Sequence, residues 1–334
     1  MKLTKIALGV ALVAGTVAAQ AADPIWFPHV VVSGTVTTIA TVINDGASAG
    51  SQHWIYAGKN MALGQDVDLF NAEPCSEVDY DVPTSDNNVQ SADLGAIISK
   101  AGDYGVIFND PSVKNNWRAG VDFSNPYSIA DQYRAGAFAT RGYLAVQEDA
   151  ATGTLAGYAL VFDYKTGSAW GYTAEPLTDT QMAEHNFTPF GAHLMPKNEV
   201  ISRLMVTPTT DTAADMLPIS AGGTANFGNL SVILTADVIG TGNVVNRDEK
   251  PISGAAVKAV TCVGTVDMYD LISPGAQKSV PDGGWIKVMS NAGPAGIETG
   301  AVIYQLDFGG EGATQKTLNG MPYTGGWNNL MVVQ

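Results

Sequence analysis

The sequence has few cysteines, few histidines and few basic residues. Its 334 residues include 2 cysteines, 4 histidines and 17 lysines and arginines, against 32 aspartates and glutamates. The formal net charge is −15, whereas nucleic acid and anionic lipid are bound through basic patches. We therefore expect no nucleic-acid partner, and the acidic balance favours a soluble protein outside the cell.

The chain also lacks a long apolar run and a recognisable catalytic motif. After the N-terminal segment, no stretch reaches the roughly 20 apolar residues that a membrane-spanning helix needs. GxSxG, HExxH, P-loop and dinucleotide-binding motifs are missing from the sequence. Glu148, Asp149 and Asp163 flank a strand-rich region, but Glu148 and Asp149 run into a turn, which is a poor position for a glycosidase pair. We expect neither an enzyme nor a membrane span in the mature chain.

The first residues have the features of an export signal. Lys2 and Lys5 form a basic start, Ile6–Val17 is apolar, and Ala-Gln-Ala at 19–21 fits the small-x-small cleavage rule. Residues 1–21 are therefore predicted to be a cleaved signal peptide. The mature protein is expected to be secreted or held at the cell surface, with the periplasm as an alternative.

Cys75 and Cys262 are the two cysteines of the chain. Because exported proteins meet an oxidising environment, a disulfide between them is the expected state. Neither has a CxxC partner or an adjacent histidine, which argues against a redox or nucleophilic role. The bridge would join the first third of the chain to the last third.

Short strands rich in β-branched residues dominate the pattern. Clean alternation is found in Gly34–Ile43, Leu230–Val238 and Ala301–Phe308, separated by frequent turn signals. The predicted fold is mainly β, an antiparallel β-sandwich of immunoglobulin-like or jelly-roll type. Five prolines punctuate residues 175–224, which we expect to form an irregular proline-rich insertion.

Residues 141–174 are the most regular stretch. They are predicted to form three consecutive strands joined by two tight turns, the middle strand being apolar on both faces and so covered on both sides. Residues 66–86 are expected to be irregular, and residues 91–100 a short helix capped by Ser91. Residues 22–334 are expected to form one elaborated sandwich domain, or two tightly docked sandwiches at roughly 22–175 and 200–334.

Several short segments carry a resemblance. They are Phe27-Pro28, Thr37-Thr38-Ile39, Val42-Ile43-Asn44, Pro74-Cys75, residues 247–253 (RDEKPIS), Val260-Thr261-Cys262-Val263-Gly264 and Pro281-Asp282-Gly283-Gly284-Trp285. With these the chain resembles a loosely defined group of uncharacterised exported β proteins of Gram-negative bacteria. The resemblance implies an exported, surface-associated protein with Cys75 and Cys262 as a pair, and it carries no known activity.

Acidic residues near Cys75 are the candidates for a calcium site. Glu77, Asp79 and Asp81 supply the oxygen ligands that calcium prefers, and a bond from Cys75 to Cys262 would bring Asp267 to the same region. The chain has no DxDxDG loop, so solvated acidic loops are the competing interpretation. We expect no obligatory cofactor, with calcium as the one alternative.

Six tryptophans and four histidines remain to be considered. Trp170 and Tyr172 alternate on one face of a strand and are the candidates for a carbohydrate-binding platform. Packing in the sandwich core is the competing interpretation. His185 and His193 lie eight apart in proline-broken sequence, which is not zinc-site spacing.

The expected function is interaction without catalysis, as an adhesin, matrix or filament component. The alternative is an extracellular protein that binds or acts on carbohydrate, so the expected partner is protein, including a second copy, or an extracellular glycan. If Gly34–Ile43 or Leu230–Val238 lay at a sheet edge, its unpaired backbone groups would permit self-association by strand donation.

Overall fold

The computed structural model describes residues 24–32, 36–46, 50–61, 67–95, 107–109, 139–148, 154–163, 169–184, 190–291, 300–309 and 331–333. These residues form four antiparallel sheets, which confirms the mainly β, sandwich-type fold expected from the sequence. The predicted signal peptide, His185, Trp117 and Trp327 lie outside the described residues.

Sheets 1 and 2 are built from the first half of the chain. Sheet 1 has the order β10-β1-β7-β3-β4, with the bounds Glu175–Pro176, Ile25–Val32, Ala139–Glu148, Gly50–Met61 and Ser76–Thr84. Sheet 2 has the order β6-β5-β2-β8-β9, with the bounds Ile107–Phe108, Val89–Asp93, Val36–Asn44, Leu155–Asp163 and Ala169–Thr173.

Sheets 3 and 4 are built from the second half. Sheet 3 has the order β17-β12-β19-β20, with the bounds Gly264–Asp267, Val200–Thr209, Gly300–Gly309 and Met331–Val333. Sheet 4 has the order β15-β14-β18-β13-β16, with the bounds Pro251–Ile252, Val244–Asn246, Gly284–Asn291, Ser231–Ala236 and Val257–Thr261. Strand β11 (Phe190–Leu194) also pairs with β18.

Helical elements are short and lie between strands. They are α1 (Val67–Ala72), α3 (Asp179–Glu184), α4 (Pro274–Gln277) and the 3-10 turns η2 (Ala213–Met216), η3 (Ile219–Ala221) and η4 (Met268–Leu271). Phe70 and Asn71 of α1 are buried, because this helix packs against β16 and β17.

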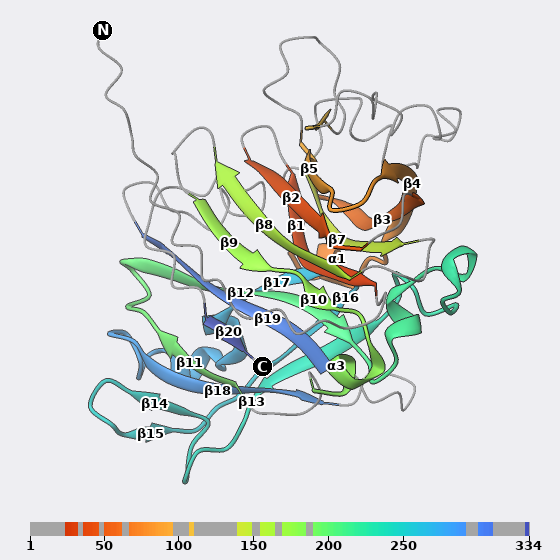
Figure 1. Cartoon of the computed structure of the whole chain (residues 1–334). Helices are drawn as coiled ribbons and strands as arrows, with labels where there is room; N and C mark the ends of the chain where they lie inside the picture. The colour runs from red at the N-terminus through yellow and green to blue at the C-terminus, as the bar shows by residue number, and fades with distance from the viewer. Residues whose placement is uncertain are drawn as a thin grey trace, which may run out of the picture.

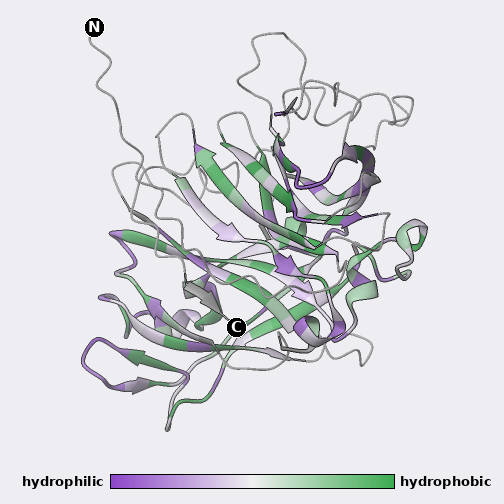
Figure 2. Cartoon of the chain, in the orientation of Figure 1, coloured by the Kyte–Doolittle hydropathy of each residue, from purple (hydrophilic) through white to green (hydrophobic). Residues whose placement is uncertain are grey.

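Sheet 3 lies between the other layers (Figure 1). Its neighbouring side chains alternate between two cores: Met205 and Tyr304 join the cluster of sheets 1 and 2, whereas Leu204 and Ile303 join the cluster of sheet 4. Both faces are thus buried, which explains the nearly continuous apolar run of β12. Figure 2 shows hydrophobic residues along the strands of the interior and hydrophilic ones at the periphery, as in the loop between β14 and β15.

The central stretch 141–174 does not form the predicted three-strand meander. β7 pairs with β1 and β3 in sheet 1, whereas β8 and β9 pair in sheet 2. Of these strands only β8 and β9 therefore pair with each other, and the two predicted turns lie outside the described residues. Strand β8 is also not covered on both sides, since Tyr158 is 50% exposed on its outer face.

Three local expectations are corrected as well. Residues 66–86 contain α1 and the nine-residue strand β4, and Ser91 lies in the strand β5 rather than at a helix cap. The proline-rich stretch supplies β10, β11 and β12, and β12 pairs along its whole length with β19. Pro189 lies outside the described residues, Pro176 ends β10, Pro196 and Pro218 lie in connections, and Pro208 is the one proline inside a strand, near the end of β12.

Neither proposed donor strand lies at an edge. β2, which holds most of Gly34–Ile43, pairs with β5 on one side and β8 on the other. β13 lies between β16 and β18. The backbone groups of both strands are used inside the molecule, so strand donation by either one is wrong.

Candidate functional site

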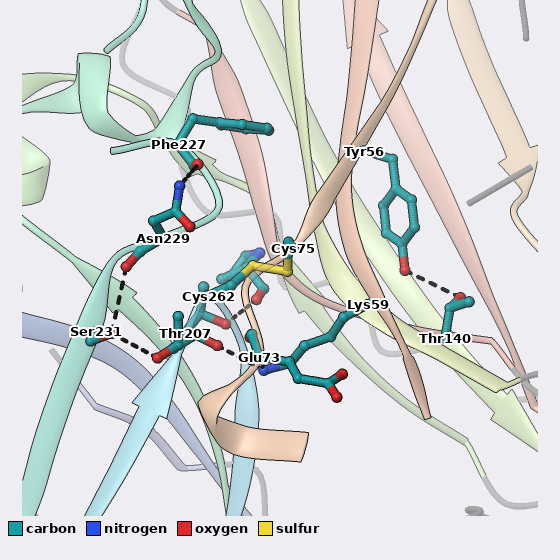
Figure 3. The surroundings of a disulfide bond; sticks show 12 residues. Tyr56, Lys59, Glu73, Cys75, Thr140, Thr207, Phe227, Asn229, Ser231 and Cys262 are labelled. Carbon is teal, nitrogen blue, oxygen red and sulfur yellow. Dashed lines mark hydrogen bonds between the residues drawn. A yellow bond between two sulfur atoms is a disulfide. The ribbon is translucent and has the colours of Figure 1, made fainter. Parts of the chain in front are cut away.

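A disulfide joins the two halves of the chain. Cys75 precedes β4, Cys262 lies between β16 and β17, and their sulfurs are 1.96 Å apart across 187 residues of sequence (Figure 3). This is the pairing that the sequence predicted. In the described part of the chain no cysteine is free.

The segment 228–230 runs past both cysteines. The amide of Cys75 donates to the carbonyl of Gly228 at 2.9 Å, and that of Cys262 donates to the carbonyl of Leu230 at 2.7 Å. Gly228 has φ +71°, and a Cβ at this position would lie 2.8 Å from the carbonyl oxygen of Cys75. A glycine is therefore required where this segment meets the bridge.

Lys59 of β3 forms a second link between the segments that carry Cys75 and Cys262, a region that we call the junction (Figure 3). Its Nζ donates to the carbonyl of Glu73 at 2.9 Å and to that of Thr261 at 2.8 Å, and it lies 4.5 Å from the ring centroid of Phe70. Burial lowers the pKa of this amine to about 7, with a smaller lowering by Arg141, the opposite residue on β7, and an opposing effect of Glu73. Lys59 therefore connects the segments that carry the two cysteines.

Asn71 of α1 adds a third connection. Its amide nitrogen donates to the carbonyl of Thr265 at 2.8 Å, and its amide oxygen accepts from the Thr265 N–H at 3.1 Å. The side chain thus pairs with one residue of β17 as a neighbouring strand would. The junction is held by covalent and hydrogen bonds together.

The calcium candidates are not brought together. Glu77, Asp79 and Asp81 lie on the edge strand β4, where His53 of β3 is 2.6 Å from Asp81 and 3.4 Å from Asp79. Burial raises the pKa of Glu77, with a further rise from Asp79. Among the described residues, no group of three or more His, Cys, Asp or Glu could hold a metal ion.

Asp267, the fourth candidate, has a different role. It ends β17, and its Oδ1 accepts from the N–H of Tyr269 at 3.0 Å, which caps η4. Burial raises the pKa of its carboxyl, and Arg203, the opposite residue on β12, partly offsets this rise. The predicted assembly with the β4 carboxylates is therefore corrected, because Asp267 faces Arg203.

Trp170 and Tyr172 do not form an exposed platform. They share one face of β9 as expected, but that face points inward and each side chain is only 6% exposed. Their ring centroids are 5.4 Å apart, and both rings contact Tyr304 of β19, at 5.8 and 5.0 Å. The competing interpretation, packing in the core, describes these residues.

Trp285 is instead the exposed tryptophan of the described residues, at 40%. It lies directly opposite His193 of β11. The Nε2 of His193 is 2.5 Å from Oδ2 of the buried Asp307, and Gln305 donates to both Asp307 Oδ1 and the His193 carbonyl. The sequence gives no signal for this group, because its members lie on three strands.

The outer face of sheet 2 carries an apolar row. Ile43 of β2 and Val89 of β5 are directly opposite each other, and Tyr158 of β8 lies opposite Thr41, two residues from Ile43. All three side chains are exposed. We call Ile43, Val89 and Tyr158 the sheet 2 row.

In the described ranges, no helix is long and apolar enough to cross a membrane. No known protein family, curated protein or solved structure matches this chain. Its function is therefore argued from its own residues.

Proposed function

We propose that this chain is a non-catalytic exported protein, secreted or displayed at the cell surface, that works by contact as an adhesin, matrix or filament component. The sheet 2 row is the observation that carries the proposal, because neighbouring exposed apolar residues on one sheet face mark an interaction surface. A second copy of the chain is the partner tested first. Identical sheet faces bury the same apolar side chains against each other without requiring a second protein.

The hydrogen-bonded junction supports the same function. A protein that bears load between partners benefits from a body whose halves are joined covalently, and the Cys75–Cys262 bond spans 187 residues. The candidate reactive groups are engaged within the fold: His53 with Asp79 and Asp81, and His193 with Asp307.

Sedimentation of the mature protein tests this proposal. We expect concentration-dependent association that is lost in Val89→Lys and Tyr158→Glu and kept in Val257→Lys, a control on β16 at an even more exposed position. Measurements with and without calcium are included because the β4 carboxylates are suitable oxygen ligands. A wild type that stays monomeric at high concentration in both conditions would contradict the assembly function.

The export part of the proposal has its own test. Mass spectrometry of the N-terminus of exported material should find Ala22 or Asp23 as the first residue, as the cleavage rule predicts. Retention of Met1 in that material would overturn both the signal peptide and the extracellular location.

Carbohydrate binding is the second candidate, and Trp285 favours it. An exposed indole offers an apolar face for stacking on a sugar ring, and the nearby His193 is held by Asp307. Glycan-array binding that disappears in Trp285→Ala but persists in Val257→Ala would support this function. No binding by the wild-type protein would reject it.

A further inference from the structure

His29 lies where three sheets meet. It belongs to β1 of sheet 1, beside the irregularity in pairing between Phe27 and Val30. The hydroxyl of Tyr172, from sheet 2, donates to the His29 carbonyl and accepts from its N–H. Thr207 of sheet 3 donates to the carbonyl of the preceding residue, Pro28. The segment around His29 is thus part of the contact between sheets 1, 2 and 3.

The imidazole of His29 is completely buried, and among the described residues neither of its nitrogens has a hydrogen-bond partner. The ring of Trp170 is a neighbour, at 6.0 Å between ring centroids. A neutral ring is tolerated in such surroundings. Protonation would create a charged ring with two N–H donors and no acceptor, which is costly in an apolar interior.

The groups around His29 make a positive charge still less favourable. Arg141 of β7 repels it, and Lys59 of β3 lies opposite Arg141 on the neighbouring strand. Tyr304 of β19 stays neutral, because burial raises its pKa well above the usual value, with smaller effects of Tyr172 and Glu175. Burial, followed by Arg141, lowers the pKa of His29 well below 6.5.

We propose that His29 is an acid-sensitive switch, and that its protonation in a mildly acidic medium loosens the contact of sheet 3 with sheets 1 and 2. Histidine is suited to this role because its charge changes near physiological pH. The element with two states is the contact between sheets 1, 2 and 3 at His29, which stays closed when the ring is neutral. When this contact is open, water reaches the ring and solvates the charge of the protonated form. This inference does not depend on the proposed function.

The direction of the pH effect follows from proton binding. In an opened or unfolded chain His29 binds a proton with a pKa near 6.5, whereas it does not do so when the contact between the three sheets is closed. The contribution of His29 to the closed state is therefore complete above pH 6.5. Below it, each pH unit lowers the ratio of closed to open molecules by up to about tenfold, until the closed-state pKa is reached.

Hydrogen exchange of the full mature chain between pH 7.5 and 4 tests the switch. Wild-type β1, β12 and β19 should lose protection below pH 6.5, before the β13–β16 pair of sheet 4. In His29→Leu the pH of half-loss should move down by at least about one unit. His53→Gln, on β3, is a control that should behave as the wild type. An unchanged midpoint in His29→Leu would overturn the proposal.

A measurement on the wild type covers the case in which His29→Leu does not fold. In histidine-labelled protein, NMR should show the ring of His29 neutral at pH 6, and its protonation should coincide with loss of protection in sheet 3. A His29 ring that titrates near pH 6.5 while sheet 3 stays protected would contradict the proposal.

Discussion

The side-chain nitrogen of Lys59 lies 2.8 Å from the carbonyl oxygen of Thr261, 202 residues further along the chain. Thr261 directly precedes Cys262, and the other acceptor of Lys59, Glu73, lies two residues before Cys75. A buried amine and a disulfide therefore join the same two segments. A buried lysine is costly when charged, so this arrangement ties the stability of the junction to pH.

We predict that stability rises between pH 7 and 10 because of Lys59. Burial lowers its pKa to about 7 in the folded chain, whereas the unfolded pKa is near 10.4. The unfolded chain thus binds more protons in this window, and the free energy of unfolding increases with pH by up to about 1.4 kcal/mol per unit. Urea unfolding at several pH values should show this slope in the wild type and not in Lys59→Met. Equal slopes would contradict it.

Removing the disulfide should destabilise the chain strongly. In the chain-entropy model, a loop of this length contributes about 5 kcal/mol. The double variant Cys75→Ser/Cys262→Ser should unfold at a lower urea concentration than the oxidised wild type. Thiol labelling of the denatured, unreduced wild type should find no free cysteine, and two labelled cysteines would show that the bridge is not formed.

Gly142 should not tolerate a side chain. It lies opposite Gly58 in sheet 1, and an added Cβ would come within 2.0 Å of the Ala57 carbonyl and 2.7 Å of the Tyr56 ring. We expect Gly142→Ala to cost about 1–3 kcal/mol, as overpacking does. Gly191→Ala is the matched control, since no atom lies within 4 Å of its added Cβ. Equal melting temperatures of the two variants would argue against this close approach.

Trp170 and Trp285 should differ in how much each contributes to the free energy of unfolding. Trp170 is buried among aromatic rings, so Trp170→Ala should lower the free energy of unfolding by about 3–5 kcal/mol. Trp285 is exposed, and Trp285→Ala should cost about 1 kcal/mol or less. Chemical denaturation of both variants measures the difference. A larger loss for Trp285→Ala would reverse the assignment of core and surface.

The sequence by itself predicted the strands with strong local patterns. β2 is rich in β-branched residues, whereas β13 and β19 carry apolar side chains at every second position, and both patterns are properties of neighbouring positions. The Cys75–Cys262 pair was also predictable, because a chain with two thiols has one intramolecular pairing to choose. The mainly β class followed from these observations.

Only the tertiary structure decided which strands pair and which side chains meet. Local pattern gave no means to separate β7 from β8, since partner choice depends on packing between distant segments. The same holds for the site residues: Trp170 is buried because sheet 3 covers β9 with Tyr304. Lys59 reaches Thr261, and His193 reaches Asp307, across more than a hundred positions. Such contacts form through the packing of whole sheets, so no short-range signal in the sequence records them.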